Sequence, residues 1–172
     1  MYKKILMILS LTIILNFISY PQVKDVKGWS NFYWGMNKLD VIKLYPNLKV
    51  EKSNTLVKER FVIDNNNFEI IFLFDSLKYK LHQIILRNIG HLSNGSIVYK
   101  LFRKKLITKY GVPVLTEEPK IKVGVVKNLY ENFTTLWSFP SSTIELQLFP
   151  DYPSRKFNLE IIYSENIKSE KL

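Results

Sequence analysis

The stretch Trp34-Gly35-Met36-Asn37-Lys38-Leu39-Asp40-Val41-Ile42, closed by Tyr45-Pro46, predicts a tight turn followed by a short helix. Gly35 can adopt a backbone conformation that a side chain would penalise. Asn37 is a favourable N-cap, and Asp40 stands where a capping box places its acidic residue. Pro46 disfavours the helical conformation at Tyr45, so the helix is expected to end there. The remainder of the chain is expected to fold around this helix.

The first twenty residues predict a secretory leader. Lys3 and Lys4 give a basic start, and an apolar run over residues 5–18 follows; this is the pattern of a signal peptide. Phe17 lies two residues before Ser19, the expected last leader residue, where a small side chain is usual. An uncleaved N-terminal anchor is therefore the alternative. In both cases we expect an exported protein of the periplasm, the cell envelope or the medium.

Composition excludes several classes of protein. The chain has no cysteine, which excludes a lipid anchor on a leader cysteine, a disulfide framework and a thiolate nucleophile. Without Lys3 and Lys4, residues 21–172 carry 23 basic and 15 acidic residues, a net charge of +8. Attraction to anionic lipid or polysaccharide would explain this excess, and a lysine-rich composition set by AT-rich codons would explain it as well. Export makes nucleic acid the least expected partner.

Alternating apolar residues predict two sets of strands. An apolar stripe at helical spacing, from Ile97 to Tyr110, predicts a long helix between them, and Gly111 and Pro113 mark its end. The expected elements are strands 56–63, 68–74 and 79–88, a helix at 96–110, and strands 129–139, 143–149 and 157–163. We therefore expect an α+β fold. It would consist of two helix-plus-three-stranded-antiparallel-meander halves, residues 21–91 and 92–172, with the helices packed on the sheet.

An offset of 76 residues, without a gap, places residues 61–87 on residues 137–163 and predicts an internal repeat. Apolar residues then meet apolar residues in all three strands, as in the pair Ile85 and Ile161. A slip of one residue would exchange the two faces of a strand. Because the apolar alternation of the two segments stays in phase through two turns, the pattern favours tandem duplication.

Two groups of motifs carry a resemblance to known proteins. Trp34-Gly35-Met36 followed by Val41 resembles the opening of small exported bacterial proteins of unknown function. Tyr110-Gly111-Val112-Pro113, a later strand with Trp137 and a final strand ending in Tyr163 resemble the second half of the same group. The helix-then-meander unit is also similar to the β-lactamase-inhibitor-like fold. The resemblance implies a binding or scaffolding role and transfers no site residue.

The sequence offers little catalytic or metal-binding chemistry. His82 and His91 are its only histidines, and no ligand spacing accompanies them. No phosphate-binding glycine motif and no nucleophile elbow occur. We therefore expect a non-enzymatic protein without a cofactor or a metal. The rival interpretation is a small hydrolase that uses His91 with Ser93 or a nearby carboxylate, although Ser93 or Asn94 is better explained as the N-cap of the long helix.

The first candidate binding surface is aromatic. It consists of Trp29, Phe32, Tyr33 and Trp34. Aromatic residues concentrate binding energy at protein interfaces, and the alternative is that these four pack under the fold. On this basis we expect an exported binding or scaffolding module that contacts an envelope or secreted protein.

The second candidate surface is basic. It consists of the pairs Lys78–Lys80 and Arg155–Lys156, at equivalent strand starts. Lysines that protect strand ends from aggregation would give the same pattern. A basic surface would suit anionic lipid or polysaccharide, the alternative partners. Attachment to a membrane is expected only through an uncleaved leader.

Overall fold

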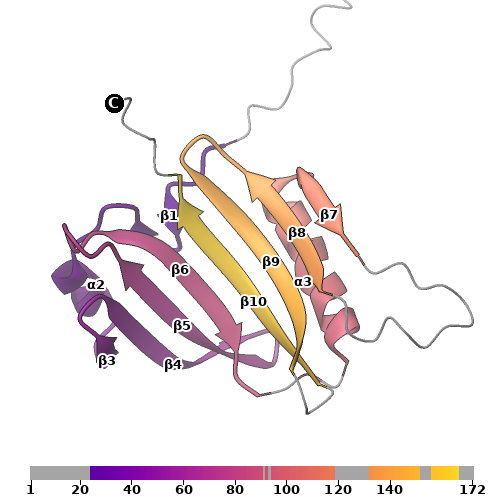
Figure 1. Cartoon of the computed structure of the whole chain (residues 1–172), viewed down its shortest axis with the longest axis horizontal. Helices are drawn as coiled ribbons and strands as arrows, with labels where there is room; N and C mark the ends of the chain where they lie inside the picture. The colour runs from indigo at the N-terminus through magenta and orange to yellow at the C-terminus, as the bar shows by residue number, and fades with distance from the viewer. Residues whose placement is uncertain (1–23, 91, 93, 119–131, 152–155, 167–172) are drawn as a thin grey trace, which may run out of the picture.

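One antiparallel sheet forms the body of the protein, shown as a computed structural model in Figure 1. The structure describes residues 24–90, 92, 94–118, 132–151 and 156–166. The elements, in chain order, are β1 (Gly28–Trp29), β2 (Phe32–Tyr33), α2 (Lys38–Leu44), β3 (Lys49–Lys52), β4 (Thr55–Ile63), β5 (Asn66–Phe74), β6 (Leu81–Asn88), α3 (Gly95–Tyr110), β7 (Leu115–Glu117), β8 (Phe133–Ser138), β9 (Ser142–Asp151) and β10 (Lys156–Glu165).

The predicted fold of two helix-plus-three-stranded-meander halves is wrong. The strands form a single eight-stranded sheet in the order β3-β4-β5-β6-β10-β9-β8-β7, and β1 pairs with β2 separately. The last strands of the two expected halves, β6 and β10, pair with each other, with Ile85 opposite Ile162. Separate meanders would leave the edges of β6 and β10 unpaired, and a ladder between them satisfies those backbone groups. The protein is consequently mostly β, with α-helical additions.

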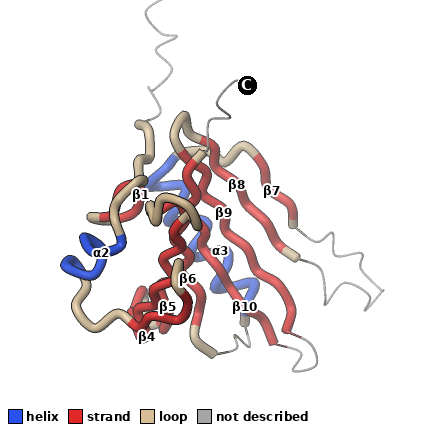
Figure 2. The backbone as a smooth tube through the Cα atoms, turned by 60° about the vertical axis from the view of Figure 1, so that its left-hand side comes forward, coloured by secondary structure: helices blue, strands red, loops and turns tan. Residues whose placement is uncertain are grey.

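The two helices do not both pack on the sheet as predicted. Only α3 packs extensively on the sheet, against β9 and β10, and in Figures 1 and 2 it lies behind β8 and β9. The short helix α2 lies apart from α3 in both views and buries a single residue completely, Val41. The long helix, and not the Trp34–Pro46 region, is therefore the main helical cover of the core.

The local predictions around both helices are largely confirmed. Gly35 has a φ of +81°, and α2 ends at Tyr45, whose backbone is extended. The predicted capping box is wrong, because the Asn37 side chain makes no cap hydrogen bond. Its Oδ1 accepts a hydrogen bond from Lys80 Nζ at 2.7 Å instead. The long helix ends at the predicted residue, with Gly111 as its C-cap.

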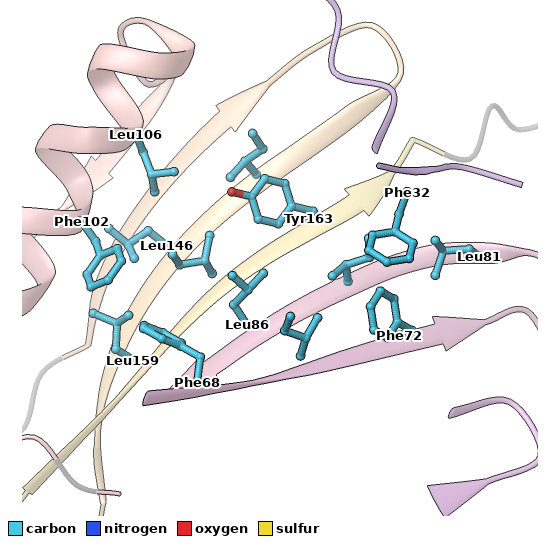
Figure 3. Close-up of a cluster of buried hydrophobic side chains, with 14 of the residues drawn as sticks. Phe32, Phe68, Phe72, Leu81, Leu86, Phe102, Leu106, Leu146, Leu159 and Tyr163 are labelled. Atoms are coloured by element: carbon cyan, nitrogen blue, oxygen red, sulfur yellow. The ribbon is translucent and has the colours of Figure 1, made fainter. Parts of the chain in front are cut away.

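The core lies on one face of the sheet, covered by α3 at one end and by Phe32 of the N-terminal hairpin at the other (Figure 3). The predicted alternation in β5 is confirmed: Phe68, Ile70, Phe72 and Phe74 are all fully buried. Phe102 and Leu106 of α3 point toward the strands, and Phe68 meets Phe102 edge to face at 5.4 Å between ring centroids. Phe68 thus contacts the helix, whereas Phe72 on the same face of β5 packs on Phe32 and Tyr45.

The first residue of α3 is placed by close packing. A Cβ on Gly95 would lie 2.7 Å from Phe157 Cβ and 3.0 Å from Leu148 Cδ1. Only a residue without a side chain lets the helix start approach β9 and β10 this closely. The sequence predicted that the helix begins one residue later, at Ser96, which placed Gly95 in the preceding loop.

The strand register alters the expected repeat in its third strand. Ile70 on β5 and Leu146 on β9 keep the offset of 76, and both are buried. Their partners on β6 and β10 are Leu86 and Ile161, which are 75 residues apart. Ile85, which the uniform offset matched to Ile161, is on the opposite, partly exposed face. A register shift between Leu73 and Phe74 in the β5–β6 ladder accompanies this difference. Tandem duplication itself stays a prediction.

Candidate functional site

A pocket of about 770 Å³ lies where three parts of the chain meet. Its walls are residues 24–28 and 30–33 around the β1–β2 hairpin, residues 109–111 at the end of α3, and Phe139 after β8. These segments are distant in sequence, so the pocket exists only in the folded protein. Its size is in the range of pockets that hold small organic ligands.

Two side chains fasten the N-terminal wall of the pocket to the β8–β9 turn. The Asp25 carboxylate accepts hydrogen bonds from the Ser141 backbone N–H at 3.0 Å and from Ser141 Oγ at 2.6 Å. Ser142 Oγ donates to the Val26 carbonyl at 2.6 Å. The hairpin beyond is tight, because a Cβ on Gly28 would overlap the Phe32 carbonyl. The wall is therefore held by specific bonds and by a position that only glycine fits.

The helical wall is fastened by a tryptophan from the sheet. Trp137 on β8 is 1% exposed, and its indole Nε1 donates to the Gly111 carbonyl at 2.8 Å. This bond satisfies a carbonyl at the end of α3, where backbone acceptors lack helical partners. Tyr110 packs against Phe139 at 5.9 Å and against Tyr163 at 6.3 Å, both edge to face. The aromatic wall is thus continuous with the core.

The charge of the pocket is positive. Lys24, Lys27 and Lys109 line it, and Asp25 is its one lining carboxylate. The Ser141 hydrogen bonds lower the pKa of Asp25, so this carboxylate is ionised at neutral pH, and each of its oxygens accepts one of these bonds. None of the three lysines forms a salt bridge within the described part of the chain. Lys109 Nζ lies over the Tyr110 ring, 4.9 Å from its centroid.

Tyr163, behind the aromatic wall, predicts a loss of stability at alkaline pH. Burial, together with the neighbouring Tyr110, raises the pKa of the Tyr163 phenol well above its ordinary value. An unfolded tyrosine ionises near about pH 10, so above that pH the unfolded state loses a proton that the folded state keeps. The free energy of unfolding is therefore expected to be unaffected below about pH 10 and to fall above it.

Urea unfolding between pH 8 and pH 11.5, followed by circular dichroism, would measure this loss. The Tyr163→Phe variant should show a smaller decline than the natural sequence, and Tyr79→Phe, at an exposed tyrosine, should show the full decline. An identical pH profile for Tyr163→Phe and the natural sequence would contradict the assignment.

The four predicted aromatic residues divide between the core and the pocket. Phe32 is 4% exposed and packs on Phe72 at 4.7 Å, while Tyr33 is 55% exposed; both line the pocket. Trp29 does not line it and contacts Phe32, Phe61 and Tyr163. Trp34 packs against the core, and its Nε1 is buried without a hydrogen-bond partner in the described structure. Packing under the fold thus accounts for most of this group.

The predicted basic pairs do not form one patch. Lys78 is exposed, Lys80 is bound to Asn37, and Lys156 begins β10; Arg155 lies outside the described residues. β6 and β10 are antiparallel, with Gln83 opposite Ser164. The starts of these two strands therefore lie at opposite ends of the sheet.

The described residues provide no site for the rival hydrolase interpretation. His91 and Ser93 lie outside the described residues, and His82 is on β6. The described chain contains no cluster of histidine, aspartate or glutamate suited to a metal ion. Among its helices, none has the length and apolar character needed to cross a membrane.

The lysines of the pocket were missed by sequence reasoning. Lys24 and Lys27 stand three residues apart in a segment without a clear pattern, and Lys109 belongs to the wet side of a regular helix. Their convergence depends on the Asp25–Ser141 and Trp137–Gly111 bonds, which join residues 116 and 26 positions apart. No local signal in the sequence indicates such contacts.

Comparison with known proteins gives no match: no protein-family model, no curated protein and no solved structure is significantly similar to this chain. The function is therefore argued from the pocket and its surroundings.

Proposed function

We propose that the protein is an exported, non-catalytic binding module whose pocket binds an anionic amphiphile, a molecule with a carboxylate or phosphate and an apolar body. The observation that carries this proposal is the charge of the pocket: three lysines line it, and its single carboxylate is already bound to Ser141. Export rests on the predicted leader. The proposal develops the alternative of an anionic ligand, which the sequence had left beside a protein partner.

The two kinds of wall match the two parts of such a ligand. Lys24, Lys27 and Lys109 supply three positive charges against the one negative charge of Asp25, and this excess attracts an anion and raises its rate of association. Tyr110 and Phe139 supply apolar surface, worth roughly 25 cal/mol for each Å² that a ligand buries. The lysines are thus expected to determine preference for an anion, and the aromatic wall to supply much of the affinity.

The arrangement supports binding more than catalysis. No histidine or cysteine is among the described residues that line the pocket, and Ser141 donates a hydrogen bond to each oxygen of Asp25. A general base works best when its pKa lies near the operating pH, and the lowered pKa of Asp25 makes it a weak base. The exposed Tyr33 at the pocket would suit a protein side chain as well as a lipid, so a protein partner is an outcome of the test below.

The test is a fluorescence titration of the full-length protein with a dansyl-labelled twelve-carbon fatty acid, below its micelle concentration, and with its methyl ester. The protein should bind the acid at least tenfold more tightly than the ester, and Lys24→Gln/Lys27→Gln/Lys109→Gln should bring that ratio close to one. Three exposed charge contacts of about 0.2–1 kcal/mol each would together give a preference of about 3- to 150-fold, and tenfold lies within this range. The preference should also shrink as salt is raised from 0.05 to 0.5 M.

A matched control replaces lysines outside the pocket, Lys52→Gln/Lys78→Gln, and should leave the ratio unchanged. Equal binding of acid and ester by the natural sequence would refute an anion site. If the triple variant kept its preference for the acid, the anion would bind elsewhere. If the protein bound neither the fatty acid nor its ester but bound an envelope protein saturably at Tyr33, the protein partner would be favoured.

A further inference from the structure

The outward face of α3 combines lysines with exposed apolar side chains. Pairs of exposed residues recur at every helical turn from residue 96 to residue 109. Four of them are lysines, Lys100, Lys104, Lys105 and Lys109, and two are large apolar residues, Ile97 at 66% exposure and Leu101 at 43%. The whole of α3 contains no acidic residue.

The lysines of this face are mostly free to meet an external anion. Lys105 is paired with Asp64 at 2.5 Å, whereas Lys100 and Lys104 have no salt bridge with any described residue. Lys109 belongs both to this face and to the pocket wall. The basic face of α3 and the basic pocket are therefore one continuous surface.

The opposite side of the molecule carries acidic residues. Glu69 and Glu145 alternate with buried residues on β5 and β9, so they stand on the sheet face that α3 does not cover. Glu160 on β10 is only 9% exposed and lies opposite Arg87 on β6. Arg87 on the same face is engaged by two of them, with Nε 2.6 Å from Glu160 Oε1 and Nη1 3.3 Å from Glu69 Oε1. An anionic surface would therefore attract the α3 side more strongly than this face, whose carboxylates are partly neutralised by Arg87, and this difference favours one orientation.

We propose that the outward face of α3 lies on an anionic lipid bilayer, with Ile97 and Leu101 among the headgroups and the lysines at the lipid phosphates. Apolar area and lysines together strengthen the binding of a helix to an anionic membrane surface. The core-facing side of α3 packs on the sheet, so Ile97 and Leu101 are the apolar area that its outward face offers. A polysaccharide or a nucleic acid would satisfy the lysines but would offer no apolar layer to the two exposed side chains. The observed pairing of charge with apolar surface therefore favours lipid.

The same placement identifies the source of the pocket ligand, an inference that rests on the proposed function. Because Lys109 joins the two surfaces, the pocket would open beside the bilayer, and its anionic amphiphile would be a lipid of that bilayer. The predicted leader ends at residue 20, four residues before Lys24. Four residues reach at most about 14 Å when extended, so a leader kept as an anchor would hold the pocket close to the same membrane.

The natural absence of cysteine allows a direct test with the full-length protein. An NBD fluorophore is attached to a single introduced cysteine, Ile97→Cys on α3 or Leu77→Cys at an exposed turn position. The labelled proteins are mixed with vesicles of phosphatidylcholine alone or of phosphatidylcholine and phosphatidylglycerol in equal parts. We expect NBD emission at position 97 to rise at least twofold on the anionic vesicles only, and emission at position 77 to stay constant on both.

Charge reversal supplies the second arm. Lys100→Glu/Lys104→Glu should abolish the rise at position 97, although any leader in the protein would still insert into both vesicles. No rise at position 97, an equal rise on neutral vesicles, or an equal rise at position 77 would overturn the proposed orientation.

The experiments distinguish an error in the proposed pocket ligand from an error in the proposed membrane contact of α3, whose outward face is called the docking face below. Lys24→Gln/Lys27→Gln should reduce the preference for the fatty acid over its ester and keep the emission rise at position 97. If the rise persists while the natural protein shows no preference for the acid, the docking face stands and the proposed ligand of the pocket is wrong. If the preference is present without the rise, the pocket stands and the bilayer is not its surface.

Discussion

Replacing Trp137 by alanine is expected to lower the free energy of unfolding by about 3–5 kcal/mol, the usual range for a buried tryptophan or phenylalanine. Trp137 is among the largest fully buried side chains, and its removal leaves a cavity between β8 and the end of α3. The Gly111 carbonyl also loses its indole donor. Because Gly111 lines the pocket, binding of the anionic amphiphile should weaken together with stability.

Urea denaturation followed by far-ultraviolet circular dichroism would measure the change in unfolding free energy. A typical domain has only about 5–15 kcal/mol in total, so the alanine variant could be largely unfolded. Trp137→Phe keeps most of the packing and removes the hydrogen bond, and a smaller loss of about 1–2 kcal/mol is expected. The neighbouring Ser138→Ala, at an exposed position, serves as the control. A loss below 1 kcal/mol for Trp137→Ala would show that this residue does not hold the end of α3.

The features that the sequence predicted are those decided by neighbours along the chain. The apolar stripe and the Gly111–Pro113 stop predicted α3 to within one residue of its observed span, Gly95–Tyr110. The alternation of Phe68, Ile70, Phe72 and Phe74 predicted the buried face of β5. Both patterns repeat with the period of their element, so they are independent of what the element packs against.

The features that the sequence missed are decided by contacts between distant segments. The pairing of β6 with β10 joins residues more than 70 positions apart. Every edge strand of a separate meander has free backbone groups, so the sequence does not show which two edges pair. Gly95 is a single-residue example. The sequence does not distinguish a glycine in an open loop from one that must be glycine because Phe157 packs against it. The shift from an offset of 76 to one of 75 was hidden because apolar residues occupy both faces of β6, at Ile84, Ile85 and Leu86.

The candidate site was predicted only in part for the same reason. Phe32 and Tyr33 were identified because aromatic residues are conspicuous in a sequence, and both line the pocket. The lysines were not identified, since a lysine on the wet side of a helix or in a leading segment is ordinary. Their significance arises from the fold, which brings Lys24 and Lys27 to the end of α3 beside Lys109.

Replacing Phe68 by alanine should also cost about 3–5 kcal/mol in unfolding free energy, and the change tests how the sheet acts as one body. Phe68 is fully buried on β5, in the first half of the sheet, yet its ring meets Phe102 of α3, which otherwise packs on β9 and β10. The ring pair therefore ties the first half of the sheet to the helix of the second half. Truncation should weaken both halves together, so that unfolding stays a single cooperative transition.

A double-mutant cycle with Phe102→Ala would isolate the ring contact, and a coupling of about 0.5–1.5 kcal/mol is expected for an edge-to-face pair. Phe68→Leu keeps the apolar volume in case the alanine variants do not fold, and Tyr79→Ala, at an exposed aromatic position, should cost less than 1 kcal/mol. Zero coupling, or separate transitions for the two halves, would mean that α3 is held by β9 and β10 alone. Cooperative unfolding with the expected coupling would mean that Phe68 helps to hold α3. The basic face and the pocket would then depend on a residue in the other half of the sheet.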